Sequence, residues 1–155
     1  MYLELLGSGL VWSINYDRRT EHNFWLRAGF GYYSWDTTNE PGQFGSAGSM
    51  TMFPMAVTKL VGNAGSWFEI GLGTTFIHVD QSQTSVFGLV SGSNARTSAS
   101  ASAYVVSGII GYRWSPATTG SIFRIGFTPF FFAFDSSTVV RILRPWGGLS
   151  LGFAF

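Results

Sequence analysis

Residues 68–76 read FEIGLGTTF, and this stretch decides the fold class. Its even positions carry Phe, Ile, Leu, Thr and Phe, whereas the odd positions between them carry Glu, Gly, Gly and Thr. A period of two residues is that of a β-strand, because successive side chains point to opposite faces of a sheet. The stretch therefore predicts a strand with one large apolar face and one face of small or polar residues.

The same alternation recurs from one end of the sequence to the other. It predicts eight strands, at residues 2–6, 10–17, 24–32, 53–58, 68–76, 104–114, 123–131 and 149–155. The large residues change parity after Gly9, and glycine supplies the positive φ of a tight turn, so we expect a hairpin turn at Gly7-Ser8-Gly9. The alternative is one long strand with a bulge at these glycines.

The connections between the predicted strands alternate in length. Short ones are expected at residues 18–22, 62–66 and 115–120, and long ones at 34–49 and 80–99. A third connection on the long-loop side is expected at 135–138, with 139–143 extending the last strand. Short turns at one end and longer loops at the other are typical of outer-membrane barrels. Pro54 and Pro129 fall inside predicted strands, where proline cannot donate to the ladder, so we expect bulges there.

Composition limits the fold further. The 155 residues suffice for a single domain over residues 1–155, with 46% hydrophobic residues but only 11% charged ones, against about 25% in a soluble domain. There is no cysteine, and the net charge of +1 argues against a nucleic-acid partner. No apolar run reaches the roughly 18 residues that a membrane helix needs.

These features favour an antiparallel up-and-down β-barrel of eight strands in a membrane. The interior of such a barrel is just wide enough for side chains, so the many large residues must face lipid and the small ones the lumen. Aromatic residues gather at both ends of the predicted strands, as expected of two interfacial belts. A soluble two-sheet sandwich, with the large residues inside, is the alternative.

The C-terminal residues carry a resemblance to a known group of proteins. Leu149, Leu151, Phe153 and Phe155 resemble the terminal signature that the barrel-assembly machinery reads in bacterial outer-membrane proteins. The whole chain is similar in size and pattern to the small barrels of the OmpA-membrane-domain and OmpX type. This resemblance implies a multi-pass protein of the Gram-negative outer membrane, in contact with phospholipid and lipopolysaccharide. A signal peptide would then have been removed before Met1.

Charged residues on the small face form the first candidate site. They are Glu4, Arg27, Glu69, Arg113 and Arg124. Each lies within a few residues of a short turn or of the N-terminus, so all share one depth, and buried charges must pair to offset their desolvation. We expect a network of ion pairs that closes the lumen. A narrow or gated pore lined by these charges is the alternative.

An enzyme is the second candidate. Some eight-stranded barrels modify lipid A with a His, a Ser and a carboxylate near the outer rim, and here His78, Asp80 and Ser82 lie at the end of a strand. However, His78 shares the lipid-facing parity of Phe76, so we predict no catalytic residue. His22 is expected to be solvated in a turn. The spacing of histidines and carboxylates indicates no metal site, and no cofactor is expected.

The third candidate is an accessory role in a larger outer-membrane complex. Phe130, Phe131 and Phe132 form the longest bulky cluster, and the small residues Ala28 and Gly108 fall on the lipid face, where they permit close approach by a neighbour. The sequence therefore predicts a structural or accessory protein, with a small pore and a lipid A-modifying enzyme as alternatives.

Overall fold

The computed structural model describes residues 1–20, 24–37, 45–63, 65–85, 95–116, 119–134 and 139–154. Its elements, in chain order, are β1 (Tyr2–Leu6), the 3-10 turn η1 (Gly7–Gly9), β2 (Trp12–Arg19), β3 (Phe24–Asp36), β4 (Gly45–Asn63), β5 (Ser66–Ser85), β6 (Ala95–Trp114), β7 (Gly120–Phe127), β8 (Phe130–Phe134), β9 (Val139–Arg144) and β10 (Gly147–Ala154). In these ranges no helix has the length and apolar character to cross a membrane.

The strands form a closed antiparallel barrel. Their order is β5-β4-β3-β2-β1-β10-β7-β6, and β6 pairs in turn with β5 to complete the circle. β8 continues β7 after Thr128 and Pro129, and β10 continues β9 after Pro145 and Trp146, so ten segments make eight barrel strands. The predicted eight-stranded barrel is confirmed, and β1 is a separate first strand.

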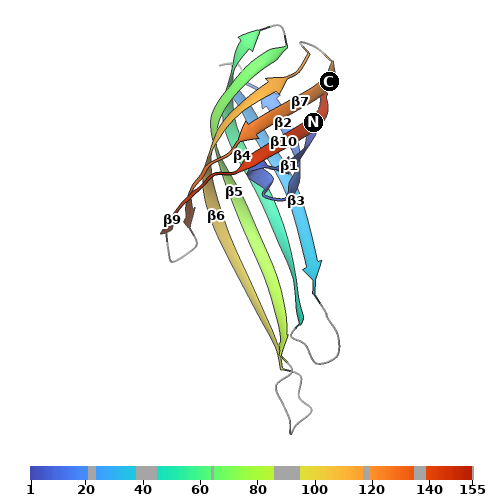
Figure 1. The fold of residues 1–155 in the computed structure, drawn as a ribbon, viewed down its shortest axis with the longest axis vertical. Coiled ribbons are helices and arrows are strands. Elements are labelled where there is room, and N and C mark those ends of the chain that lie inside the picture. Colours follow the sequence, from blue (N-terminus) through green and yellow to red (C-terminus); the bar gives the residue numbers. More distant parts are fainter. Residues whose placement is uncertain are drawn as a thin grey trace.

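The two ends of the barrel differ, as Figure 1 shows. The N and C marks of the chain and the C-terminal ends of β2, β4 and β6 lie at one end, here called the turn end. From it, β4, β5 and β6 run for 19, 20 and 20 residues to the opposite end, here called the loop end. A membrane-spanning strand needs only about 9–11 residues.

This length corrects the expected connections at 34–49 and 80–99. β3 continues to Asp36, β4 already begins at Gly45, and the β5–β6 ladder runs out to the pair Ser85–Ala95. The reason is that ladder hydrogen bonds join backbone groups, so a Ser-, Ala- and Thr-rich segment pairs as readily as an apolar one.

Large side chains face outward and small or polar ones face inward. Leu72, Leu151 and Phe153 are among the most exposed large residues, whereas Ser13, Thr75 and Ser107 are fully buried inside the barrel. This is the orientation predicted for a barrel in lipid, and it is the reverse of a soluble sandwich, whose large residues would be inside.

Two rows of outward-facing rings circle part of the barrel. The loop-end row joins Phe30, Phe53, Phe76, Tyr104 and Phe134, with ring centroids 5.4, 6.3, 5.1 and 5.5 Å apart along the row. The turn-end row joins Tyr112, Trp114 and Phe123, with centroids 4.4 and 5.3 Å apart. Such rows are typical of the aromatic girdles of membrane barrels.

The barrel is complete only in its turn-end half. β2 pairs with β3 no further than Phe30, and β10 pairs with β7 no further than Phe127. Beyond these points β9 pairs only with β8, and the rest of β3 only with β4, within the described residues. The loop-end half is therefore a sheet of β3, β4, β5, β6, β8 and β9 that is open between β3 and β9.

The turn at Gly7-Ser8-Gly9 differs from the expected tight hairpin. These residues form η1, followed by Leu10 and Val11, so β2 begins at Trp12 rather than at Leu10. Gly7 has the expected positive φ of 68°, but Leu6 and Leu10 also have φ of 61°. η1 is buried, because the turn folds into the barrel instead of extending the wall.

The two prolines behave differently. At Pro54 the β4–β5 ladder is regular, and the β3–β4 ladder omits this position without a change of register, so the predicted bulge is wrong there. At Pro129 the chain leaves β7 for β8, and the β6–β8 register shifts between Val106 and Ser107. Here an irregularity is present, as predicted.

Candidate functional site

The inward charges lie together in the turn-end half of the lumen. Glu4 comes from β1, Asp17 from β2, Arg27 from β3, Glu69 from β5, Arg113 from β6 and Arg124 from β7. The strand register brings them together: Asp17 lies opposite Arg27, and Ser150 lies between Glu4 and Arg124 in one row around the wall. These six residues are called the charge cluster below.

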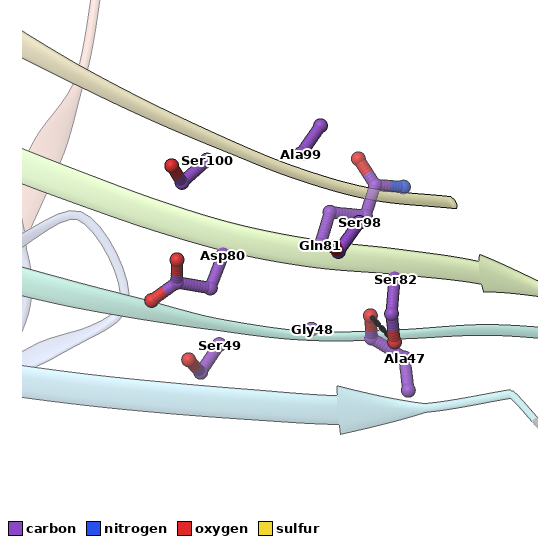
Figure 2. A pocket seen from close by; sticks show the side chains of 9 residues that line it. All are labelled: Ala47, Gly48, Ser49, Asp80, Gln81, Ser82, Ser98, Ala99 and Ser100. Atoms are coloured by element: carbon purple, nitrogen blue, oxygen red, sulfur yellow. Dashed lines mark hydrogen bonds between the residues drawn. The ribbon is translucent and has the colours of Figure 1, made fainter. Parts of the chain in front are cut away.

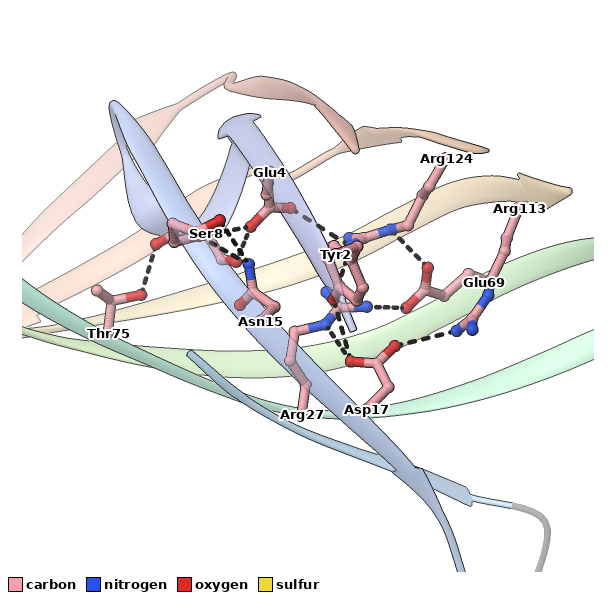
Figure 3. Close-up of polar contacts among 11 residues, drawn as sticks. Tyr2, Glu4, Ser8, Asn15, Asp17, Arg27, Glu69, Thr75, Arg113 and Arg124 are labelled. Atoms are coloured by element: carbon pink, nitrogen blue, oxygen red, sulfur yellow. Dashed lines mark hydrogen bonds and ion pairs between the residues drawn. The ribbon is translucent and has the colours of Figure 1, made fainter. Parts of the chain in front are cut away.

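Glu69 is the centre of the charge cluster (Figure 3). One carboxylate oxygen accepts from Arg27 Nη2 at 2.7 Å, and the other lies 2.7 Å from Arg124 Nε. Arg124 Nη1 also lies 3.4 Å from Glu4 Oε1. One carboxylate from β5 therefore joins two arginines from opposite parts of the wall.

Asp17 makes the second pair of bridges. Its Oδ1 accepts from Arg27 Nε at 3.0 Å, and its Oδ2 accepts from Arg113 Nη1 at 3.0 Å. The side chains of all these ion pairs are between 0 and 4% exposed. Three carboxylates thus meet three guanidinium groups, and the cluster is neutral.

Asp17 is the member that the sequence prediction missed. It shares the inward parity of Ser13 and Asn15, which are both fully buried. The predicted set held two carboxylates against three arginines, and this imbalance was the signal that a third carboxylate was needed, since a buried unpaired charge is costly.

Tyr2 connects the two groups of ion pairs. Its hydroxyl donates to Asp17 Oδ1 at 3.0 Å and accepts from Arg124 Nη1 at 3.3 Å. The guanidinium carbons of Arg27 and Arg124 lie 5.4 and 5.9 Å from the centroid of its ring, within the range of a cation–π contact. Tyr2 therefore fills the space between Arg27 and Arg124 and accepts one hydrogen bond from Arg124.

The η1 turn closes the lumen on the other side of the cluster. Ser8 Oγ donates to Glu4 Oε2 at 2.7 Å, and Thr75 on β5 donates to the Ser8 carbonyl at 2.8 Å. The turn therefore reaches the opposite wall (Figure 3). A Cβ on residue 7 would lie 2.6 Å from Glu4 Oε1, so glycine at this position lets the turn pack against the Glu4 carboxylate.

The arrangement blocks the barrel at this level. A hollow of 170 Å³ enters from the turn end, and its lining includes Tyr2, Asp17, Trp25 and Arg113. It ends on the charge cluster, whose side chains are nearly inaccessible to water. Breaking one partner of a buried pair typically costs about 3–5 kcal/mol, so the cluster is suited to hold the wall together rather than to pass ions.

The candidate catalytic residues lie elsewhere, on the outward face near the loop-end row. His78 Nδ1 lies 2.8 Å from Ser102 Oγ on β6, and His78 Nε2 lies 3.2 Å from Asp80 Oδ2. Ser82 donates instead to the Ala47 carbonyl at 3.4 Å, so Ser102 takes the position considered for Ser82. The side chains of His78 and Asp80 are 39 and 60% exposed.

This hydroxyl–imidazole–carboxylate chain lies on two neighbouring strands of the sheet. Residues 77–80 pair with both β4 and β6, whereas residues 100–103 pair only with β5 among the described residues. Backbone N–H donors aimed at a developing oxyanion are usually needed as well. The arrangement is an exposed set of polar contacts across two strands.

A shallow polar depression lies beside Asp80 (Figure 2). It has a volume of about 370 Å³ and is lined by Ala47, Gly48, Ser49, Asp80, Gln81, Ser82, Ser98, Ala99 and Ser100. Asp80 is the one charged residue in this lining. The depression offers hydroxyl groups but no cluster of opposite charges for a specific ligand.

The remaining candidates are placed as follows. Leu149, Leu151 and Phe153 project outward from β10 and are exposed, while Phe155 and His22 lie outside the described residues. The role of the C-terminal residues in assembly stays a prediction. Comparisons with protein-family models, with curated proteins and with solved structures returned no match.

Proposed function

We propose that this protein is an integral barrel of the bacterial outer membrane with a structural or accessory role, whose lumen is held shut by the charge cluster. The observation that carries the proposal is the set of ion pairs across the lumen, with side chains 0–4% exposed. A pore needs a continuous path that water can enter, and here six paired charged side chains fill the lumen and are almost inaccessible.

The outward face supports the membrane location. Between the two rows of rings it presents aliphatic residues such as Met55, Val57, Ile70 and Leu72. A closed barrel pairs its backbone groups within the wall, which is the condition for strands to lie in lipid. Beyond the loop-end row, β5 and β6 carry Ser, Thr, Gln and Ala, which suit the aqueous side.

Conductance tests the closed lumen. The refolded protein, inserted into a planar bilayer, is expected to give no discrete current steps, while protease protection shows that it has inserted. Steps that persist in the inserted protein would overturn the proposal in favour of the pore. As a positive control, the Arg113→Ala/Asp17→Ala variant removes the side chains nearest the turn-end hollow and should increase any leak.

An accessory role predicts a partner. Extraction from native membranes in mild detergent, followed by mass spectrometry, should recover a second outer-membrane protein at a fixed ratio, besides phospholipid, lipopolysaccharide and, transiently, the barrel-assembly machinery. A barrel that is recovered with lipid alone would leave a purely structural role.

The contacts of His78 with Ser102 and Asp80 favour a second candidate, a hydrolase that acts on lipid A. We propose that the chain is not an enzyme, since His78 and Asp80 are exposed and the depression beside them has no cluster of opposite charges for a specific ligand. Incubation with lipid A should leave its mass unchanged for the wild type and for His78→Ala alike. A mass change that disappears in both His78→Ala and Ser102→Ala would establish the enzyme instead.

A further inference from the structure

The outward face of β4, β5 and β6 contains an apolar groove of about 570 Å³. Leu72 on β5 and Ile110 on β6 are part of its lining, and Gly108 contributes no side chain. Pro129 and Phe131 form one side, because a Cβ on Gly108 would meet both of them at 3.2–3.3 Å. The chain thus has a depression where a barrel wall usually presents a continuous layer of side chains.

Lys59 is the one charged residue in the lining of this groove. It pairs with Phe24, the first residue of β3, so it lies at the turn end of the groove. Lys59 is exposed, and its Nζ lies 5.9 Å from the centroid of the Phe24 ring. It is the only lysine in the sequence.

The groove and Lys59 together match an amphiphile with one anionic group. Apart from Lys59 the groove is almost entirely apolar, and no carboxylate is part of its lining. A cation at the end of an apolar groove complements a phosphate that is linked to an acyl chain. Lysine near the end of a membrane-spanning segment extends its ammonium group toward the interface in the same way.

We propose that this surface binds one phospholipid of the leaflet at the turn end of the barrel, with an acyl chain in the groove and the phosphate on Lys59. The proposal rests on the membrane location given above. A free phosphate ion would gain nothing from the apolar groove, and a lipid without phosphate would gain nothing from Lys59. The ligand must therefore carry both groups.

The test uses the full chain refolded into vesicles that contain equal parts of phosphatidylglycerol and diacylglycerol with matched acyl chains. After extraction into mild detergent, native mass spectrometry counts the lipids that stay bound. The wild type is expected to retain one phosphatidylglycerol. Lys59→Gln should lower the retained fraction roughly tenfold, since a charge-assisted hydrogen bond contributes on this scale, and Lys59→Arg should keep it.

A matched control tests whether the loss of any exposed cation at the turn end lowers lipid retention. Arg18 is exposed at the turn end of β2 and does not line the groove. Arg18→Gln should retain lipid at the wild-type level. Equal loss in Arg18→Gln and Lys59→Gln would overturn the proposal, as would equal retention of diacylglycerol.

A second pair of variants tests the groove itself. Ile110→Trp fills it, whereas Ile125→Trp places the same ring on β7 outside its lining. Only Ile110→Trp should lower retention, and equal behaviour of the two variants would refute the groove. Protease protection is measured on every sample: a wild type that fails to insert contradicts the membrane location, whereas an inserted wild type without bound lipid contradicts this inference alone.

Discussion

The two halves of the barrel share β4, β5 and β6 but are stabilised in different ways. In the turn-end half eight strands close the wall, and the charge cluster with Tyr2 fills its interior. In the loop-end half the sheet is open between β3 and β9, and its outward ion pair, His78 with Asp80, is exposed. The halves therefore differ both in backbone pairing, which closes only the turn-end half, and in the side chains that fill the interior.

The comparison shows where the stability of this fold resides. Ladder hydrogen bonds exchange for bonds to water on unfolding, so their net contribution is modest. Buried ion pairs, by contrast, penalise the loss of either partner heavily. We therefore expect substitutions in the turn-end half to have large effects and equivalent substitutions in the loop-end half to have small ones.

Arg124→Leu should have the largest effect. It leaves Glu69 with one cation and Glu4 without its ion pair, and we expect a loss of about 3–5 kcal/mol in the free energy of unfolding. Urea unfolding in detergent, followed by tryptophan fluorescence, measures it. Arg18→Leu, which removes an exposed arginine, should stay within about 0.5 kcal/mol, and an equally small effect for Arg124→Leu would disprove the buried cluster.

Gly7→Ala should come next, with a loss of about 1–3 kcal/mol. The new Cβ would lie 2.6 Å from the Glu4 carboxylate, at a backbone φ of 68° that is unfavourable for alanine. Gly147→Ala is the matched control, since its nearest atom would lie at 3.5 Å. The same unfolding assay compares them, and equal midpoints would place η1 outside the lumen.

Thr75→Val should cost about 1 kcal/mol. It removes the hydrogen bond that the Thr75 hydroxyl donates to the Ser8 carbonyl across the lumen, while keeping the shape of the side chain. Thr74→Val changes the neighbouring residue, which points to the opposite face, and should be neutral or slightly stabilising. The contact across the lumen is absent if the two variants have the same stability.

His78→Ala should have the smallest effect, below about 0.5 kcal/mol, because an exposed ion pair contributes little. The measured quantity is again the urea midpoint. A loss comparable to that of Arg124→Leu would break the comparison, since it would show that the loop-end half also contributes strongly to stability.

The alternation of large and small residues was enough to predict the barrel, its eight strands and which side chains face outward. It also placed Glu4, Arg27, Glu69, Arg113 and Arg124 on the inner face, because parity alone determines the face of a strand. Asp17 has the same parity, but parity alone does not select it. It follows only if the number of buried carboxylates is required to equal the number of buried arginines.

Other features could not be derived from alternation. The length of β5 and β6 beyond the loop-end row depends on backbone pairing of residues 79–85 with 95–101, whose small side chains carry little pattern. The opening between β3 and β9 depends on where the short β1–β2 hairpin stops. The end of this hairpin is set by η1, which folds into the lumen. There η1 is held by the hydrogen bond from Thr75 on β5, a residue distant in the sequence.

The contacts of the charge cluster also differ in sequence separation, and this has a consequence for assembly. Ser8–Glu4 and Arg27–Asp17 join residues 4 and 10 positions apart, whereas Arg27–Glu69, Arg113–Asp17 and Arg124–Tyr2 join residues 42, 96 and 122 positions apart. Local contacts close small loops and form first. The N-terminal segments can thus collect an excess of carboxylate early, and the arginines of β6 and β7 neutralise it when those strands arrive. Charge balance is then reached before β10 pairs with β1 and closes the barrel.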